Sequence, residues 1–154
     1  ALYTGLPAIA DDAGLCVEAF GGRPGVDTAY YATLFGYAKS DDNNVVALLE
    51  QMAGIDDRRA ALVSTLVAVR SATDPEPPIA AGRAAGLITH EAIGDKGCGL
   101  DPVMWLPEFE QTFAQLPVEV KNANSHRGKA SQIMLGLIRQ RWLEPQPSHR
   151  PTAV

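Results

Sequence analysis

Two adjacent carboxylates, Asp11 and Asp12, follow an apolar run at residues 8–10 and precede a second apolar run that begins at Leu15. Like charges at neighbouring positions repel each other and favour water. Such a pair is typical either of the exposed tip of a strand–turn–strand or of a site where a cation neutralises it. Mg²⁺ held by one or two carboxylates is the usual arrangement in phosphate chemistry.

A glycine-rich stretch, KGCGLDP at residues 96–102, is the second candidate for chemistry. Glycines let backbone N–H groups approach a ligand closely, and Asp101 can accept hydrogen bonds from a base or a sugar. The alternative is a plain turn closed by an Asp-Pro pair.

A basic stretch, KNANSHRGKA at residues 121–130, precedes a predicted helix. It contains Lys121, His126, Arg127 and Lys129. A helix N-terminus favours anions, so basic residues there oppose the helix dipole unless an anion lies between them. The alternative is a solvated helix start. Together, a carboxylate pair, a glycine loop and a cluster of cations suit metal-assisted hydrolysis of a phosphoanhydride.

The surrounding patterns predict the elements that position these residues. We expect two short strands, one on each side of an acidic turn at Asp11 and Asp12, followed by a loop rich in glycine and proline. Apolar residues at helical spacing behind SDDNN predict a helix over residues 41–53. Alternating valines predict a strand within residues 58–71, and the run at 79–93 is its expected hairpin partner.

The C-terminal third contains a short predicted strand, VMWLPE, and the clearest helix of the sequence. The apolar residues of that helix recur at i, i+3, i+4 and i+7, and Ser125 or Asn124 could cap it. They are Ala130, Ile133, Met134, Leu137, Ile138 and Trp142. The tail at 144–154 has three prolines and few apolar residues, so we expect disorder there. The order of elements predicts one mixed α/β domain over residues 1–143.

Composition limits the classes of function. The chain has 154 residues, 46% hydrophobic residues and a net charge of -5. The acidic balance argues against nucleic-acid binding, and no apolar run approaches the ~20 residues of a membrane span. The two cysteines, Cys16 and Cys98, form neither a disulfide framework nor a CxxC pair. With no leader pattern at the first residues, we expect a protein of the reducing cytoplasm.

Four segments of this sequence, in order, resemble the inosine triphosphate pyrophosphatase family. They are TGLPAIADDAGLCVEAFGGRPGV at 4–26, GCGLDPV at 97–103, QTFAQL at 111–116 and VKNANSHRGKA at 120–130. The resemblance implies a long twisted sheet flanked by helices, with a cleft between two lobes, and a homodimer. It also implies Mg²⁺-dependent hydrolysis of non-canonical purine nucleoside triphosphates (ITP, dITP, XTP) to monophosphate and pyrophosphate.

The resemblance also assigns roles to residues of this sequence. Asp12 matches the proton acceptor that activates water and touches the metal, and its neighbour Asp11 is a candidate metal ligand. The implied substrate-binding positions are Ala13, Cys98, Gly99, Leu100, Asp101, Lys121, His126 and Arg127.

Four positions depart from the family pattern. Ala13 replaces a serine, Leu100 replaces a tyrosine, and Tyr30 replaces an arginine. Cys98 replaces a phenylalanine expected to stack on the purine, and base–aromatic stacking is worth about 1–3 kcal/mol. We therefore expect weaker purine binding, unless Tyr30 supplies the stack.

The family also opens with a strand and a T-x-N-x-x-K loop that grips the triphosphate, whereas this sequence starts just before TGLPA. The expected fold is thus an N-terminally truncated version. Three interpretations follow: an active pyrophosphatase, a non-catalytic dimeric nucleotide-binding or interaction protein on the same fold, and a pyrophosphatase with a shifted base preference, such as a modified pyrimidine nucleotide.

Overall fold

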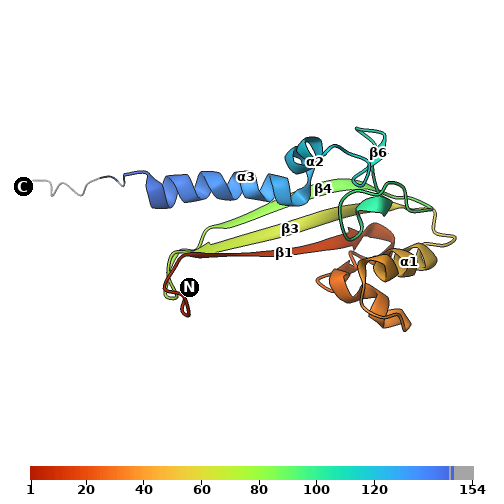
Figure 1. Ribbon diagram of the computed structural model, residues 1–154, viewed down its shortest axis with the longest axis horizontal. Helices are drawn as coiled ribbons and strands as arrows, with labels where there is room; N and C mark the ends of the chain where they lie inside the picture. The colour runs from red at the N-terminus through yellow and green to blue at the C-terminus, as the bar shows by residue number, and fades with distance from the viewer. Residues whose placement is uncertain (146, 148–154) are drawn as a thin grey trace, which may run out of the picture.

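The computed structural model describes residues 1–145 and 147 and contains a six-stranded antiparallel sheet in the order β2-β1-β3-β4-β5-β6 (Figure 1). The strands are β1 (Ala8–Val17), β2 (Pro24–Gly25), β3 (Arg59–Val69), β4 (Ile79–Ile88), β5 (Met104–Leu106) and β6 (Gln111–Thr112). The helices are α1 (Asp41–Gln51), α2 (Val118–Asn124) and α3 (His126–Ile138), with 3₁₀ segments η1 (Glu18–Phe20), η2 (Thr28–Phe35) and η3 (Asp101–Val103) and the π-helical segment η4 (Arg139–Leu143).

Three long strands, β1, β3 and β4, form the frame of the sheet. Their pairing is uninterrupted: Ala8 lies opposite Val69 and Val17 opposite Ala60. The β3–β4 pair is the predicted hairpin, and α1 begins at the predicted residue. The mixed α/β fold with a long sheet and flanking helices is therefore confirmed.

Both α1 and α3 cover the same face of this frame, at opposite ends. Side chains alternate between the faces of a strand, so Leu15 of β1 and Leu62 of β3 share a face, and both belong to the core cluster that includes Leu48 of α1. Farther along that face, Leu66 of β3 clusters with Met134 of α3. We call this surface the helix face.

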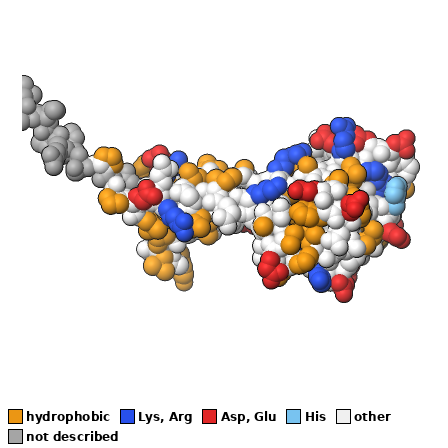
Figure 2. All heavy atoms as spheres, turned by 90° about the horizontal axis from the view of Figure 1, so that it is seen from above, with side chains coloured by type: hydrophobic (Ala, Val, Ile, Leu, Met, Phe, Trp, Pro, Cys, Tyr) orange, Lys and Arg blue, Asp and Glu red, His pale blue; other side chains and the backbone are white. Residues whose placement is uncertain are grey.

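The opposite surface, which we call the open face, carries Asp12, Thr65, Ala81 and Arg83, all of them exposed. Hydrophobic side chains are also exposed near the end of the frame where β1 begins (Figure 2). Those of Leu2, Tyr3 and Leu6 before β1, of Ile9 on the helix face and of Ile79 on the open face are more than half exposed. The two faces of the frame therefore differ sharply in what covers them.

The predicted acidic turn is wrong. Asp11 and Asp12 lie within a single strand, opposite Leu66 and Thr65 of β3. Because successive side chains of a strand point to opposite faces, the two carboxylates are separated by the strand itself and do not need a turn to reach water. Strand alternation thus removes the repulsion that the sequence pattern suggested.

Glycine allows α3 to approach β4 and α2 closely. A Cβ atom at Gly82 would lie 2.0 Å from the backbone oxygen of His126, and one at Gly128 would lie 1.7 Å from the backbone oxygen of Asn122. No other residue fits at these two positions without moving a backbone. The basic segment is held at this junction of helix and sheet.

The helix predicted after NANS is confirmed as α3, and a second helix that the sequence pattern did not predict, α2, precedes it. Ser125 ends α2 and caps α3, with its hydroxyl accepting the N–H of Gly128 at 3.0 Å. The predicted helix also changes character at Arg139, where η4 begins. The tail predicted to be disordered falls mostly outside the described residues. Within them, no helix has both the length and the apolar composition that a membrane crossing requires.

Candidate active site

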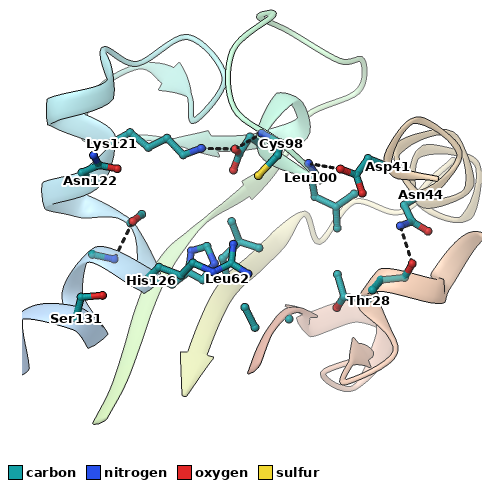
Figure 3. Close-up of a pocket in the computed structure, with 18 of the residues that line it drawn as sticks. Thr28, Asp41, Asn44, Leu62, Cys98, Leu100, Lys121, Asn122, His126 and Ser131 are labelled. Carbon is teal, nitrogen blue, oxygen red and sulfur yellow. Dashed lines mark hydrogen bonds and ion pairs between the residues drawn. The ribbon is translucent and has the colours of Figure 1, made fainter. Parts of the chain in front are cut away.

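A cavity of about 640 Å³ lies on the helix face between α1 and α3 (Figure 3). Its floor is formed by Ala13 and Leu62 of the sheet, and its walls come from three segments far apart in the chain. These are α1 with η2, the loop at residues 97–101, and the α2–α3 junction. A volume of this size is in the range that holds a nucleotide-sized ligand.

One contact joins the sheet to α3 beside the cavity. The carboxylate of Asp11 accepts a hydrogen bond from Ser64 Oγ at 2.6 Å and an ion-paired hydrogen bond from Arg127 Nε at 2.6 Å. Burial raises the pKa of Asp11, but the Ser64 hydroxyl and the Arg127 guanidinium outweigh it, so the pKa lies below its ordinary value. Asp11 is therefore ionised at neutral pH and positions Arg127.

A second contact joins the glycine loop to α2. Asp101 is 5% exposed, and its carboxylate accepts the backbone N–H of Cys98 at 2.8 Å and an ion-paired hydrogen bond from Lys121 Nζ. The two polar stretches predicted from the sequence, 96–102 and 121–130, thus meet through the buried carboxylate of Asp101.

A third contact joins the glycine loop to α1. The carboxylate of Asp41, in the first turn of α1, accepts the backbone N–H of Gly99 at 3.0 Å. Figure 3 shows Asp41 directed at the loop from the opposite wall. The sequence pattern indicated only an N-cap here, and the cap is Ser40, whose hydroxyl accepts the N–H of Asn43. Because Ser40 already caps α1, the acidic residue that follows it is not needed as a cap. This was the signal in the sequence that could have identified Asp41.

His126 provides an unsatisfied polar group at the cavity. It is 7% exposed, and its Nδ1 is buried with no hydrogen-bond partner in the described structure. Burial lowers the pKa of His126, and the Arg127 guanidinium lowers it further, against the opposing effect of Asp101. The imidazole is therefore neutral at pH 7.

All eight substrate-binding positions suggested by the resemblance line this cavity: Ala13, Cys98, Gly99, Leu100, Asp101, Lys121, His126 and Arg127. Asp12 is not among the lining residues, because it lies on the open face. Sequence reasoning missed further polar residues of the walls, namely Thr28, Asp41, Asn44, Ser131 and Gln132. Asn44 is buried and accepts the N–H of Ala32 at 2.9 Å, which fixes η2 to α1.

The suggested stacking role of Tyr30 is not supported by the geometry. Tyr30 does not line the cavity, and its ring lies 4.0 Å from the Lys39 ammonium group. Cys98 is the exposed side chain at the loop, whereas Leu100 packs into the core. A base that binds at this loop would therefore contact a thiol and backbone groups and not an aromatic ring.

The Asp11–Asp12 pair does not fit a shared Mg²⁺ ion. The two side chains point to opposite faces of β1, and Asp11 already binds Ser64 and Arg127. Within residues 1–145 and 147, no group of three or more acidic, histidine or cysteine side chains gathers as a metal site would require. We therefore derive no catalytic step through a metal held by this pair.

The family model described as Ham1 family matches residues 1–136, which is most of the chain. This chain belongs to the Ham1 family. The resemblance indicated by the sequence motifs is thereby confirmed. The motifs at 4–26 and 97–130 lie within the matched region, as does every residue of the three contacts around the cavity.

Curated relatives and solved structures agree with this membership. A protein of Albidiferax ferrireducens named dITP/XTP pyrophosphatase is 71% identical over 141 residues, which are 92% of this chain and 71% of the relative. Another of the same name, from Paracidovorax citrulli, is 70% identical over 91% of this chain and 70% of its own. The structure of a HAM1 protein from Coxiella burnetii matches with a TM-score of 0.83 at 35% identity, over 91% of this chain and 71% of that one.

Proposed function

We propose that this chain hydrolyses non-canonical purine nucleoside triphosphates, dITP and XTP above all, to the monophosphate and pyrophosphate. The observation that carries the proposal is the cavity itself. It places the glycine loop, with the buried carboxylate of Asp101, opposite Lys121, His126 and Arg127. Relatives about 70% identical that carry the name dITP/XTP pyrophosphatase support the same reaction.

The nucleoside binds against the loop at residues 97–101. Its base lies beside Cys98, whose polarisable sulfur packs on the ring in place of an aromatic side chain. The floor is small and apolar at Ala13, which leaves room for the purine. The neutral imidazole of His126 lines the wall beside the nucleotide.

The phosphates lie at the start of α3. Arg127 is about half exposed, so its guanidinium can contact phosphate oxygens while Asp11 holds it. The N-terminus of α3 adds the favourable end of the helix dipole. This assigns the basic stretch the role of binding the anion.

Asp12 accepts the proton of the attacking water from the other side of β1. Ala13 lines the cavity, and Asp12 is its neighbour in β1. A triphosphate that leaves the cavity at Ala13 reaches the Asp12 carboxylate one residue away. Water attacks a phosphorus of the α–β phosphoanhydride, the bridging P–O bond breaks, pyrophosphate separates from the monophosphate, and Asp12 receives the proton of the water.

Mg²⁺ enters this scheme bound to the triphosphate, whose oxygens supply most of its ligands. We also propose that the protein works as a homodimer in the cytoplasm, as expected for an enzyme that acts on the nucleotide pool. Sedimentation velocity at micromolar concentration checks the dimer.

The test is pyrophosphate release with Mg²⁺ from dITP, XTP and ITP, beside dGTP, dATP and deoxyuridine triphosphate. We expect the deaminated purines to be preferred. Preference for deoxyuridine triphosphate would instead support the shifted base specificity that Cys98 allows. If wild-type protein binds these nucleotides and releases no pyrophosphate, the non-catalytic interpretation replaces this proposal.

A further inference from the structure

We infer that Asp41 is a positioning residue that holds the glycine loop closed over the nucleoside. This inference rests on the proposed function, because it assigns a role within the same cavity. Asp41 does not touch the reacting phosphates in the scheme above. It acts on the loop through the Gly99 backbone.

The loop needs an anchor on this side. Gly97 and Gly99 have φ values of +82° and +59°, which glycine adopts readily. A backbone of this kind loses more conformational freedom on ordering than other residues do. The anchors toward the rest of the sheet and α2 are the N–H of Lys96, bonded to the Ala114 carbonyl, and the N–H of Cys98, bonded to Asp101.

Among the described residues, one hydrogen bond connects this loop to α1, and it is the bond between Asp41 and the Gly99 N–H. Asp41 and Asp101 therefore accept consecutive N–H groups, those of Gly99 and Cys98, from opposite walls. This arrangement fixes the peptide between the two residues, which is the part of the loop that faces the base.

Asp41 is suited to this role by its place in α1. An ionised carboxylate in the first turn is favoured by the helix dipole and makes a stronger acceptor than a neutral group. Asn44, one turn later, is buried and bonded to Ala29 and Ala32, so the first turn of α1 is itself fixed to η2. Through Asp41, the fixed position of α1 thus determines the position of the glycine loop.

The neighbouring residue Asp42 supplies a matched control. Asp42 is also an exposed acid in the first turn of α1, so its removal costs the same helix-dipole interaction. In the part of the chain that the structure describes, the Asp42 side chain makes no hydrogen bond. A difference between Asp41→Ala and Asp42→Ala therefore isolates the bond to Gly99.

The experiment compares these two variants with wild type in three measurements. Amide hydrogen exchange of Gly99 in the free protein reports the bond. The Kd of dIMP, measured by calorimetry, reports nucleoside binding without turnover, and KM and kcat for dITP report the reaction. For Asp41→Ala we expect Gly99 exchange to accelerate and Kd and KM to rise by about threefold to tenfold, with kcat within about twofold of wild type.

Asp42→Ala should leave all four quantities at their wild-type values. Equal Gly99 exchange in the two variants would overturn the inference, as would faster exchange in Asp41→Ala with an unchanged Kd for dIMP. Wild-type protein that binds dIMP and releases no pyrophosphate would overturn the proposed function instead, and the exchange and Kd measurements would still decide the role of Asp41.

Discussion

Asp11 and Asp12 are neighbours in the chain, yet they lie on opposite faces of the sheet and in different surroundings. Asp11, on the helix face, is held by Ser64 and Arg127. Asp12, on the open face, is exposed and makes no hydrogen bond within the described residues. A carboxylate that must accept a proton needs to be unengaged, whereas one that positions a cation needs to be engaged. This contrast supports the proposal that Asp12 is the general base and that Asp11 positions Arg127.

The largest effect is expected from Asp12→Asn. Removing the general base should lower kcat for dITP on the order of 10²- to 10⁴-fold, with the Kd for dIMP and the free energy of unfolding close to wild type. Pyrophosphate release measures kcat, calorimetry measures the Kd, and urea unfolding measures the free energy of unfolding. An active Asp12→Asn variant beside an inactive Asp11→Asn variant would reverse the assignment.

The buried Asp101 should matter most for stability. Asp101→Ala leaves the Lys121 ammonium and the Cys98 N–H without their acceptor, which should lower the free energy of unfolding by about 2–4 kcal/mol. Urea unfolding gives the value. Asp95→Ala, an exposed acid in the same loop, is the control and should stay within about 0.5 kcal/mol of wild type. Equal losses in the two variants would argue against the contact as an anchor of the cavity.

The close packing of α3 against the helix face can be tested by replacing glycine residues with alanine. Gly82→Ala should destabilise the protein by about 1–3 kcal/mol, because its Cβ would overlap the His126 carbonyl and displace the start of α3. Gly136→Ala meets no atom within 4 Å on the exposed side of α3, and should stabilise it by up to about 1 kcal/mol. Thermal or urea unfolding separates the two, and loss of stability in both would contradict this packing.

The smallest effect concerns the Asp11–Arg127 pair. Since both side chains are partly exposed, Asp11→Asn should cost about 0.5–1 kcal/mol at pH 7. The pKa of Asp11 is lowered in the folded state, so its contribution is present above the ordinary value of 3.8 and disappears as the pH falls below it. The free energies of unfolding of wild type and Asp11→Asn should therefore converge as the pH falls below 3.8 and through the lowered pKa of the folded state. If the difference in free energy of unfolding persists at low pH, the effect of Asp11→Asn comes from side-chain packing and not from the charge of Asp11.

Much of the frame could be predicted from the sequence. The valine alternation of β3, the helical spacing in α1 and the Ser125 cap are local patterns, and each was confirmed. The acidic turn was wrong because two adjacent acids fit equally well in a strand whose faces differ, and only pairing with β3 decides between these arrangements. The sequence pattern did not predict α2, which ends at the same Ser125 that caps α3.

The cavity shows the same limit. Local residue types identified its loop and its basic segment, and the resemblance supplied eight of its lining positions. Asp41 and Asn44 were not recognised, since their roles depend on α1 lying against the loop and η2, which no pattern within α1 reveals. The catalytic role of Asp12 and the binding roles of the lining residues stay predictions until substrates are tested.

The most direct test is a crystal structure of Asp12→Asn grown with dITP and Mg²⁺. We expect the hypoxanthine ring against Cys98 and the Gly99 backbone, the phosphates beside Arg127, and the α–β bridging oxygen beside β1 within reach of residue 12. A nucleotide bound with its phosphates on the far side of the cavity from β1, or a base outside the loop at 97–101, would contradict this expectation.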